Sequence, residues 1–340
     1  MTCYHPIECI LPSTSDSDGK KKLIFSQKHE GMFFDDSPIV RDIADYANIK
    51  GFKIKVPCGR CIGCRLDYSR HWAIRAMNEA SLYRDNCFVT LTLNDDHLNG
   101  DRSLQKGMIQ SWLKRFRKRY GEGIRYLLCG EYGEKFQRPH YHILFFNFRF
   151  PDLKVHSFNK QTGEIYYRSN QLEELWTDPW SPDNSRGYSV VGDVEFQSAA
   201  YVSRYVTKKV FSKDKKYLEQ HYGLREPEFL LMSRRPGLGT EYFKEYYNDI
   251  INHDCVAVRN KKSILHLPVP RFYVNMLKDI DPELYKSYKV DKLQSLYDNL
   301  FVDNPDLSTE RLLVREELKK SKCDRLVRNF EFDPLLHNIY

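Results

Sequence analysis

Two apolar segments of β type, joined by a polar connection, constrain the fold of this chain more than any other feature. Residues 124–129 (IRYLLC) and 141–146 (YHILFF) are rich in aliphatic and aromatic side chains, a composition typical of strands. The connection between them, 130–139, is polar and contains Gly133, which favours a hairpin. A third segment, 88–93 (FVTLTL), alternates as a half-buried strand does. These segments predict an antiparallel sheet.

Helical patterns flank the strands. Apolar residues recur every three or four positions in 104–120, and Gly121 follows where a glycine cap is expected. The same analysis predicts further helices at 65–83, 171–176 and 199–211, a strand at 188–196 and a small hairpin at 155–168. The order of these elements indicates the α+β class, with a central antiparallel sheet and helices packed on one of its faces.

Three parts of the chain follow from this pattern. Residues 1–84 form a cysteine-rich N-terminal segment that ends in a helix, 85–212 form the α+β domain, and 213–340 form a mostly helical accessory region. No apolar run approaches the ~20 residues that a membrane helix needs, and the first residues lack the apolar core of an export signal. We therefore expect a cytoplasmic protein without a membrane partner.

His140 and His142 are the first candidate site. Side chains of a strand alternate between its two faces, so both imidazoles project from the same side, with Cα atoms ~6.5–7 Å apart. Two imidazoles at this spacing can share one metal ion, provided that a third ligand joins them. Glu131 precedes His140 by nine residues and can lie opposite the histidines on a neighbouring strand, with Glu134 as the alternative. The other interpretation is a surface strand with two solvated histidines.

Tyr201 and Tyr205 are the second candidate site. They lie one helical turn apart on one face, which Lys208 shares and Lys209 borders. Residues 201–216 carry six Lys or Arg and one Asp. A phenol, with a pKa of about 10, is a poor nucleophile unless a metal ion or cations stabilise the developing charge. A phosphotyrosine ester conserves the energy of a broken phosphodiester, and two tyrosines allow two successive transfers. The alternative is an amphipathic helix with tyrosines on its apolar edge.

Taken together and in order, three motifs give the chain a family resemblance. They are the strand 88–93, the segment 138–142 (RPHYH) and the segment 201–209 (YVSRYVTKK). The chain resembles the HUH endonucleases, tyrosine-nucleophile enzymes that nick single-stranded DNA to start rolling-circle replication. The segments 3–6 (CYHP) and 57–65 (PCGRCIGCR) are similar to the replication initiators of small icosahedral single-stranded DNA phages, the microviruses, and among them the gokushovirus type. The resemblance covers about residues 1–212.

This resemblance implies a mechanism. Tyr201 and Tyr205 would alternate as nucleophiles, and His140, His142 and an acidic residue, assigned as Glu131, would hold Mg²⁺ or Mn²⁺. The origin strand of the viral DNA would be nicked through a 5′-phosphotyrosine, leaving a 3′-OH for a host polymerase, and later circularised. Lys208 would lie near the scissile phosphate. The chain contains no Walker A sequence, so a host helicase is expected to unwind the DNA in the bacterial cytoplasm.

The cysteines form a separate constellation. The sequence Cys58-x-x-Cys61-x-x-Cys64, with Cys3 upstream, offers four soft ligands that can hold a structural Zn²⁺. His5 can substitute for one of them. An iron–sulfur site and reduced thiols are the alternatives.

Positive charge is concentrated in the predicted helix 104–120 and its approach. The chain has 53 Lys and Arg against 46 Asp and Glu, a net charge of +7, and residues 102–119 contain seven Lys or Arg and no acid. Such a stripe would attract a phosphate backbone, and the candidate DNA contacts are Lys114, Arg115, Arg117, Lys118 and Lys209. The alternative is that cations simply favour a helix C-terminus.

Two other functions fit the same residues. One is a non-catalytic, zinc-stabilised protein that binds single-stranded nucleic acid through its basic surface and its aromatic side chains. The other is a plasmid relaxase or transposase of the same fold.

Overall fold

The computed structural model describes residues 3–12, 23–25, 51–133, 136–158, 163–203, 215–260, 263–300 and 305–324. These residues divide into two compact units. The first unit contains the described residues up to Tyr68 and from Lys286 onward, and the second contains those between Ser69 and Tyr285. No helix of the described residues is long and apolar enough to cross a membrane.

A seven-stranded sheet forms the centre of the second unit, with the order β12-β5-β6-β4-β11-β8-β7. Every neighbouring pair is antiparallel, which confirms the predicted fold class. The strands are β4 (Asn86–Leu93), β5 (Arg125–Tyr132), β6 (Pro139–Phe146), β7 (Lys154–Phe158), β8 (Ile165–Arg168), β11 (Gly187–Gly192) and β12 (Phe229–Met232). The predicted hairpins, β5–β6 and β7–β8, are both present.

One face of the sheet packs against α3 (Lys106–Tyr120) and α4 (Asn170–Leu175). The apolar stripe of α3 consists of Ile109, Trp112, Leu113 and Phe116, all of which are buried. Its rings meet the odd-numbered residues of β6: Phe116 stacks on Phe145 with ring centroids 4.3 Å apart. This face holds the main hydrophobic core, because the alternation of each strand directs its aliphatic side chains there.

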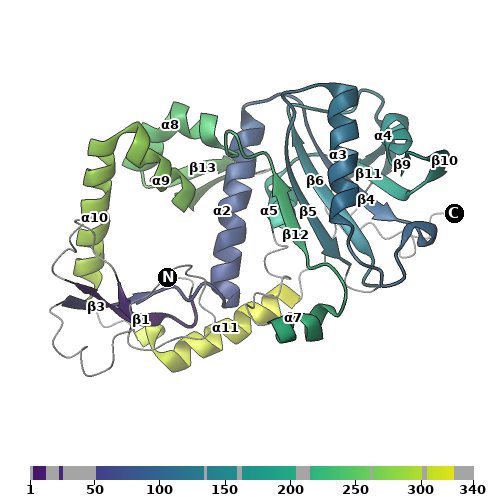
Figure 1. Ribbon diagram of the computed structural model, residues 1–340. Coiled ribbons are helices and arrows are strands. Elements are labelled where there is room, and N and C mark those ends of the chain that lie inside the picture. The colour runs from purple at the N-terminus through teal and green to yellow at the C-terminus, as the bar shows by residue number, and fades with distance from the viewer. Residues whose placement is uncertain are drawn as a thin grey trace. The chain divides into compact units, whose positions relative to one another are not determined.

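The opposite face is covered by α5 (Phe196–Ser203), which packs on β5 and β6, as Figure 1 shows. Helix α2 (Ile62–Ser81) lies against α5, where the Ser69 hydroxyl donates to the carbonyl of Ala200 at 3.3 Å. The prediction of helices on one face only was therefore wrong. Periodicity identifies 65–83 and 199–211 as helical, but the face on which a helix packs depends on contacts remote in sequence.

The rest of the second unit follows the sheet along the chain. Its elements are η1 (Asp95–His97), β9 (Thr177–Asp178), β10 (Ser181–Ser185), α7 (Lys215–Tyr222), α8 (Thr240–Asn252), β13 (Cys255–Arg259), β14 (Ile264–Pro268) and α9 (Arg271–Ile280). The short strand β12 pairs with β5 at the edge of the sheet. A Cβ on Gly130 would lie 2.8 Å from the Phe229 ring, so the glycine in β5 allows β12 to pack closely.

The first unit contains a three-stranded antiparallel sheet of order β2-β1-β3. Its elements are β1 (Ile7–Pro12), β2 (Ile24–Phe25), β3 (Gly51–Val56), most of α10 (Pro282–Leu300), η2 (Pro305–Leu307) and α11 (Thr309–Asp324). Its core is small and is built on Ile7, Cys9 and Phe25. The division at Tyr68 and Tyr285 differs from the expected boundaries at 84 and 212, which stay predictions about which segments carry which role.

Candidate active site and metal centre

His140 and His142 project from β6 on the face that α5 covers. Strand β4 holds both rings by hydroxyl groups of residues directly opposite them in register. Thr92 Oγ1 and His140 Nδ1 are 2.9 Å apart, and Thr90 Oγ1 and His142 Nδ1 are 3.0 Å apart. Because Nδ1 is engaged in each ring, Nε2 is the nitrogen that faces the site, the usual arrangement behind a metal-ligating histidine.

Glu131 and Tyr201 meet these histidines from two other elements. Glu131 of β5 is directly opposite His140 in register, and its Oε1 lies 3.3 Å from Nε2 of His142. The Tyr201 hydroxyl, on α5, donates to the same Oε1 at 2.7 Å. The Tyr201 ring meets the His142 ring edge-on, with centroids 5.0 Å apart. A carboxylate, two imidazoles and a phenol thus converge, and all four side chains are buried.

The donors fit a divalent metal ion. Nε2 of His142 is buried and has no hydrogen-bond partner, and an unpaired buried polar atom costs about 1–3 kcal/mol. Next to Nε2 of His140, a Cβ on Gly133 would lie only 2.7 Å away, so any larger side chain there would crowd that nitrogen. Two imidazoles and a carboxylate suit Mn²⁺ and related ions.

The three ligands are not closed around an ion. Across the parts of the chain that the structure describes, only the cysteine cluster has ligand atoms all within 4.8 Å of one another. His140, His142 and Glu131 would therefore draw together on a metal ion, which holds nitrogen ligands at about 2.0–2.1 Å.

Several predicted site residues lie outside the described residues. These are Tyr205, Lys208, Lys209 and Glu134. The sequence analysis missed Thr90 and Thr92. The signal was present, because the alternation of the strand 88–93 places both hydroxyls on one face, but the pairing of β4 with β6 was not predicted.

The cysteine cluster is assembled as the sequence indicated. Cys3, Cys58, Cys61 and Cys64 offer sulfur atoms that all lie within 4.8 Å of one another, close to the ~3.8 Å expected around a tetrahedral Zn²⁺ with ~2.3 Å bonds. The left-handed turn at Gly59, with φ of +74°, follows the first of the three clustered cysteines. His5 is not part of the group, since its Nε2 lies 2.7 Å from a carboxylate oxygen of Glu316.

Backbone amides stabilise negative charge on these sulfurs. The N–H groups of Arg60 and Cys61 donate to Cys58 Sγ at 3.4 and 3.3 Å, and that of Tyr4 donates to Cys61 Sγ at 3.3 Å. The hydrogen bond with the Cys3 thiol lowers the pKa of Cys58 to about 6 and also lowers the pKa of Cys61. Thiolates are the form that binds metal, so this group can hold an ion such as zinc.

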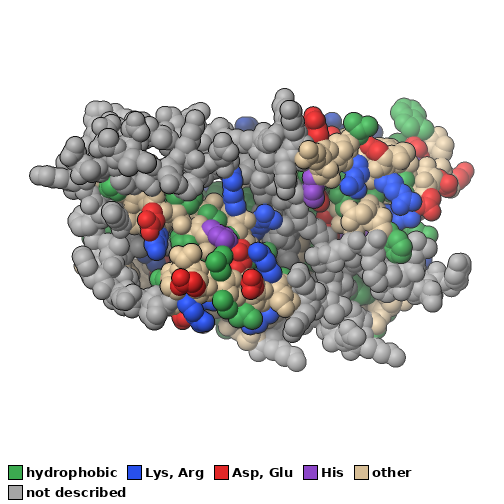
Figure 2. Space-filling view, turned by 90° about the horizontal axis from the view of Figure 1, so that it is seen from below, with side chains coloured by type: hydrophobic (Ala, Val, Ile, Leu, Met, Phe, Trp, Pro, Cys, Tyr) green, Lys and Arg blue, Asp and Glu red, His purple; other side chains and the backbone are tan. Residues whose placement is uncertain are grey.

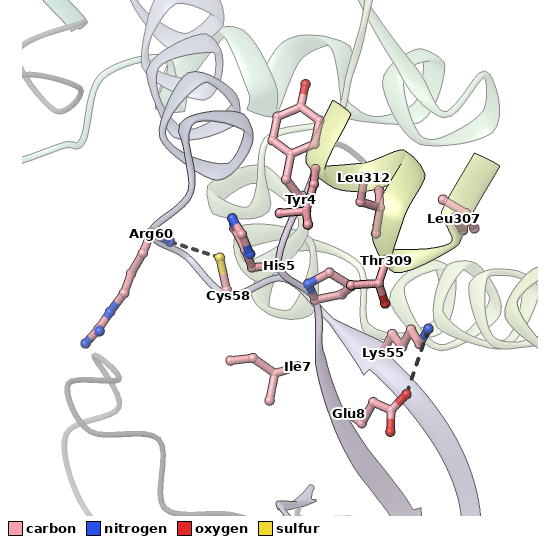
Figure 3. Close-up of a pocket in the computed structure, with 12 residues that line it drawn as sticks. Tyr4, His5, Ile7, Glu8, Lys55, Cys58, Arg60, Leu307, Thr309 and Leu312 are labelled. Atoms are coloured by element: carbon pink, nitrogen blue, oxygen red, sulfur yellow. Dashed lines mark hydrogen bonds and ion pairs between the residues drawn. The ribbon is translucent and has the colours of Figure 1, made fainter. Parts of the chain in front are cut away.

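A pocket of about 460 Å³ lies beside the cysteine cluster. Figure 3 shows Cys58 and His5 on one side of it and Leu312 of α11 on the other, with Lys55 and Glu8 paired below. The ion pair between His5 and Glu316 ties α11 to the segment that carries Cys3. The cysteine cluster therefore stands where the two ends of the first unit meet.

The basic residues of α3 lie on the other face of the sheet from His140 and His142. Arg115 is half-buried and donates to the carbonyls of Leu175 and Thr177 at 3.2 and 3.4 Å, and burial lowers its pKa. Lys114, Arg117 and Lys118 are exposed. Figure 2 shows positive and negative side chains interspersed on the described part of the surface that it presents, so no extended patch of one sign appears there.

Comparisons with known proteins agree with this site. Residues 86–210 match the family model described as replication-associated protein ORF2. The chain is 35% identical to replication-associated protein ORF2 of Spiroplasma virus 4, over 75% of the chain and 78% of that protein. It is 31% identical to replication-associated protein VP4 of Bdellovibrio phage phiMH2K, over 85% and 81%, and 28% identical to replication-associated protein ORF4 of Chlamydia phage 1, over 71% and 58%. No solved structure matches significantly. The chain belongs to the replication-associated proteins of small single-stranded DNA phages, the rolling-circle replication initiators.

Proposed function

We propose that the chain is a metal-dependent endonuclease and strand-transferase that nicks single-stranded DNA at the viral origin. The observation that carries this proposal is the convergence of the Tyr201 hydroxyl and Nε2 of His142 on one carboxylate oxygen, Oε1 of Glu131, at 2.7 and 3.3 Å. A phenol, a carboxylate and a pair of imidazoles, held by three separate elements, are the groups that tyrosine-based phosphoryl transfer requires.

Tyr201 supplies the nucleophile. Its oxygen forms a bond to the scissile phosphorus while the bond from phosphorus to the 3′ oxygen breaks, so the 5′ phosphate becomes tyrosine-linked. Glu131 accepts the hydrogen bond of the phenol and is placed to take its proton, and the departing 3′ oxygen gains a proton from water. The reversal of this step by a 3′-OH joins two DNA ends, because the ester conserves the energy of the broken bond.

His140, His142 and Glu131 would hold the divalent ion, Mg²⁺ or Mn²⁺, which neutralises charge on the scissile phosphate when bound. Thr90 and Thr92 orient the two imidazoles through their Nδ1 atoms. Tyr205 is proposed as the second nucleophile and Lys208 as a cation near the phosphate, both on the basis of the motif alone. Lys114, Arg117, Lys118 and Lys209 remain proposed DNA contacts. The host supplies helicase and polymerase in its cytoplasm.

The four cysteines are proposed to hold a structural Zn²⁺. The sulfur geometry and the amide N–H groups that donate to the sulfurs support this assignment. Its role is to fold the N-terminal segment and not to take part in the reaction.

The test of the nucleophile is covalent capture. Single-stranded oligonucleotides, labelled at their 3′ ends and tiled across the phage genome, are incubated with the protein and Mn²⁺. One of them is expected to yield a labelled protein–DNA adduct, which peptide mass spectrometry assigns to Tyr201 or Tyr205. The double variant Tyr201→Phe, Tyr205→Phe forms none, and a chelator abolishes the adduct of the parent.

Tyr167→Phe is the matched control, because Tyr167 lies on the opposite face of the sheet among the core residues, and it is expected to form adduct like the parent. An adduct that persists in the double variant would show that another residue attacks. An oligonucleotide that binds tightly but is never cut would favour a non-catalytic single-strand-binding protein. Cleavage at an origin of transfer or a transposon end would favour a relaxase or transposase.

A further inference from the structure

Two rows of side chains cross the sheet on the face that carries the site. The first row is Glu131, His140, Thr92 and Tyr188, each directly opposite the next on β5, β6, β4 and β11. The second row is Cys129, His142, Thr90 and Val190 on the same four strands. Residues opposite one another in an antiparallel sheet share a face, so Tyr188 lies on the same face as the histidines.

Exposure to solvent separates Tyr188 from the other seven side chains. Glu131, His140 and Thr92 are 1%, 2% and 1% exposed, whereas Tyr188 is 46% exposed. The whole second row is buried. Tyr188 is thus the one member of these rows that faces solvent, and it lies two strand spacings, about 9–10 Å, from His140. It marks the side on which the two rows reach the surface.

The backbone of Tyr188 is held in place by its neighbours. Gly187 has a φ of +137°, and a Cβ there would lie 2.3 Å from the carbonyl oxygen of Thr92, so only glycine permits this approach of β11 to β4. The amide of Asn94 donates to the carbonyl of Arg186 at 2.9 Å, and the Ser185 hydroxyl donates to the carbonyl of Gly187 at 3.0 Å. The ring is therefore presented from a fixed strand.

We propose that Tyr188 stacks on an unpaired base of the DNA, within one or two nucleotides of the phosphate that Tyr201 attacks. This inference rests on the proposed nicking function, since it needs single-stranded DNA to approach the histidines. Aromatic rings that bind single strands stack on bases whatever their identity. An exposed tyrosine in register with a metal-binding row has no packing role that accounts for its position, and stacking there would fix the strand against sliding.

Base stacking can be measured without cleavage. In the Tyr201→Phe, Tyr205→Phe background and without metal, 2-aminopurine is placed at each position of the origin oligonucleotide in turn. Quenching is expected at one position beside the nick site. Tyr188→Ala should remove it and weaken binding about tenfold, whereas Tyr188→Phe and Tyr188→Trp should keep both. Tyr246→Ala, which removes a tyrosine of similar exposure on α8, is the control and should match the background.

The outcomes of this experiment separate the two proposals. Equal affinity and equal quenching in the background protein and in Tyr188→Ala would overturn the stacking, even if covalent adducts form. Loss of the signal in Tyr188→Phe to the same extent as in Tyr188→Ala would also overturn it, since a ring remains. Position-specific quenching that depends on Tyr188, in a protein whose parent never forms an adduct, would uphold the stacking and reject the nicking.

Discussion

Gly133 and the hydroxyls of Thr90 and Thr92 show how much of the site depends on residues that carry no reactive group. The two threonines engage Nδ1 of both histidines, and Gly133 keeps a Cβ away from Nε2 of His140. A side chain of any size at position 133 would compete with whatever binds that nitrogen. The metal site is thus defined as much by an absent Cβ as by its ligands.

Gly133→Ala is expected to weaken metal binding. The new Cβ would lie 2.7 Å from Nε2 of His140, closer than real contacts allow, so the ring must turn away from the site. Adduct formation should fall about 10- to 100-fold, and the Mn²⁺ concentration for half-maximal rate should rise. Gly107→Ala is the control, because nothing lies within 4 Å of a Cβ at Gly107. An unchanged Mn²⁺ dependence in Gly133→Ala would contradict the assignment of His140 as a ligand.

Helix α3 shows at the level of an element that one basic cluster can serve two purposes. Arg115 bonds two carbonyls at the end of α4 and in β9, while Lys114, on the same helix, is exposed. A cation with fixed partners cannot also be free for phosphate. The predicted DNA-binding cluster therefore includes one residue whose contacts are structural.

Arg115→Ala should lower the free energy of unfolding by about 1.5–3 kcal/mol, because two carbonyl groups lose a charged donor. Lys114→Ala should change it by less than about 0.5 kcal/mol. Denaturant unfolding of the two variants measures the difference. Equal stability of the two would show that the contacts of Arg115 contribute nothing.

The elements near the site were largely predictable from the sequence, and their partners were not. The helix 104–120, the strand 88–93 and the hairpin of β5 and β6 follow from periodicity, which is a local property. The pairing of β4 with β6, and hence the roles of Thr90 and Thr92, depends on a segment about 50 residues away in sequence. Strands β12, β13 and β14 were missed because each is only four or five residues long and is flanked by helical patterns.

At the scale of the whole molecule, the two compact units differ in how much core they contain. The second has an extensive buried cluster on one face of its sheet. The first has a cluster of three buried side chains, Ile7, Cys9 and Phe25, and small cores of this kind usually need a metal or disulfides. The cysteine cluster, which joins Cys3 to residues 58–64, is the cross-link available to it.

Metal removal should therefore affect the two units unequally. The purified protein is expected to contain one Zn²⁺ per chain by elemental analysis. Chelation, or the variant Cys61→Ser, should make the first unit sensitive to limited proteolysis while the second stays resistant, because zinc binding contributes directly to folding. Cys255→Ser, in β13, is the control and should keep its zinc. A metal-free protein whose first unit resists protease would rule out a structural ion.

The outer strand of the sheet has a consequence for the smallest fragment that can fold. The family match ends at residue 210, but β5, which carries Glu131, is hydrogen-bonded along one side by Phe229–Met232. Truncation after the matched region would strip that partner and leave a row of bare amides and carbonyls next to the acidic ligand, an edge prone to self-association. The autonomous nuclease module therefore extends at least to Met232.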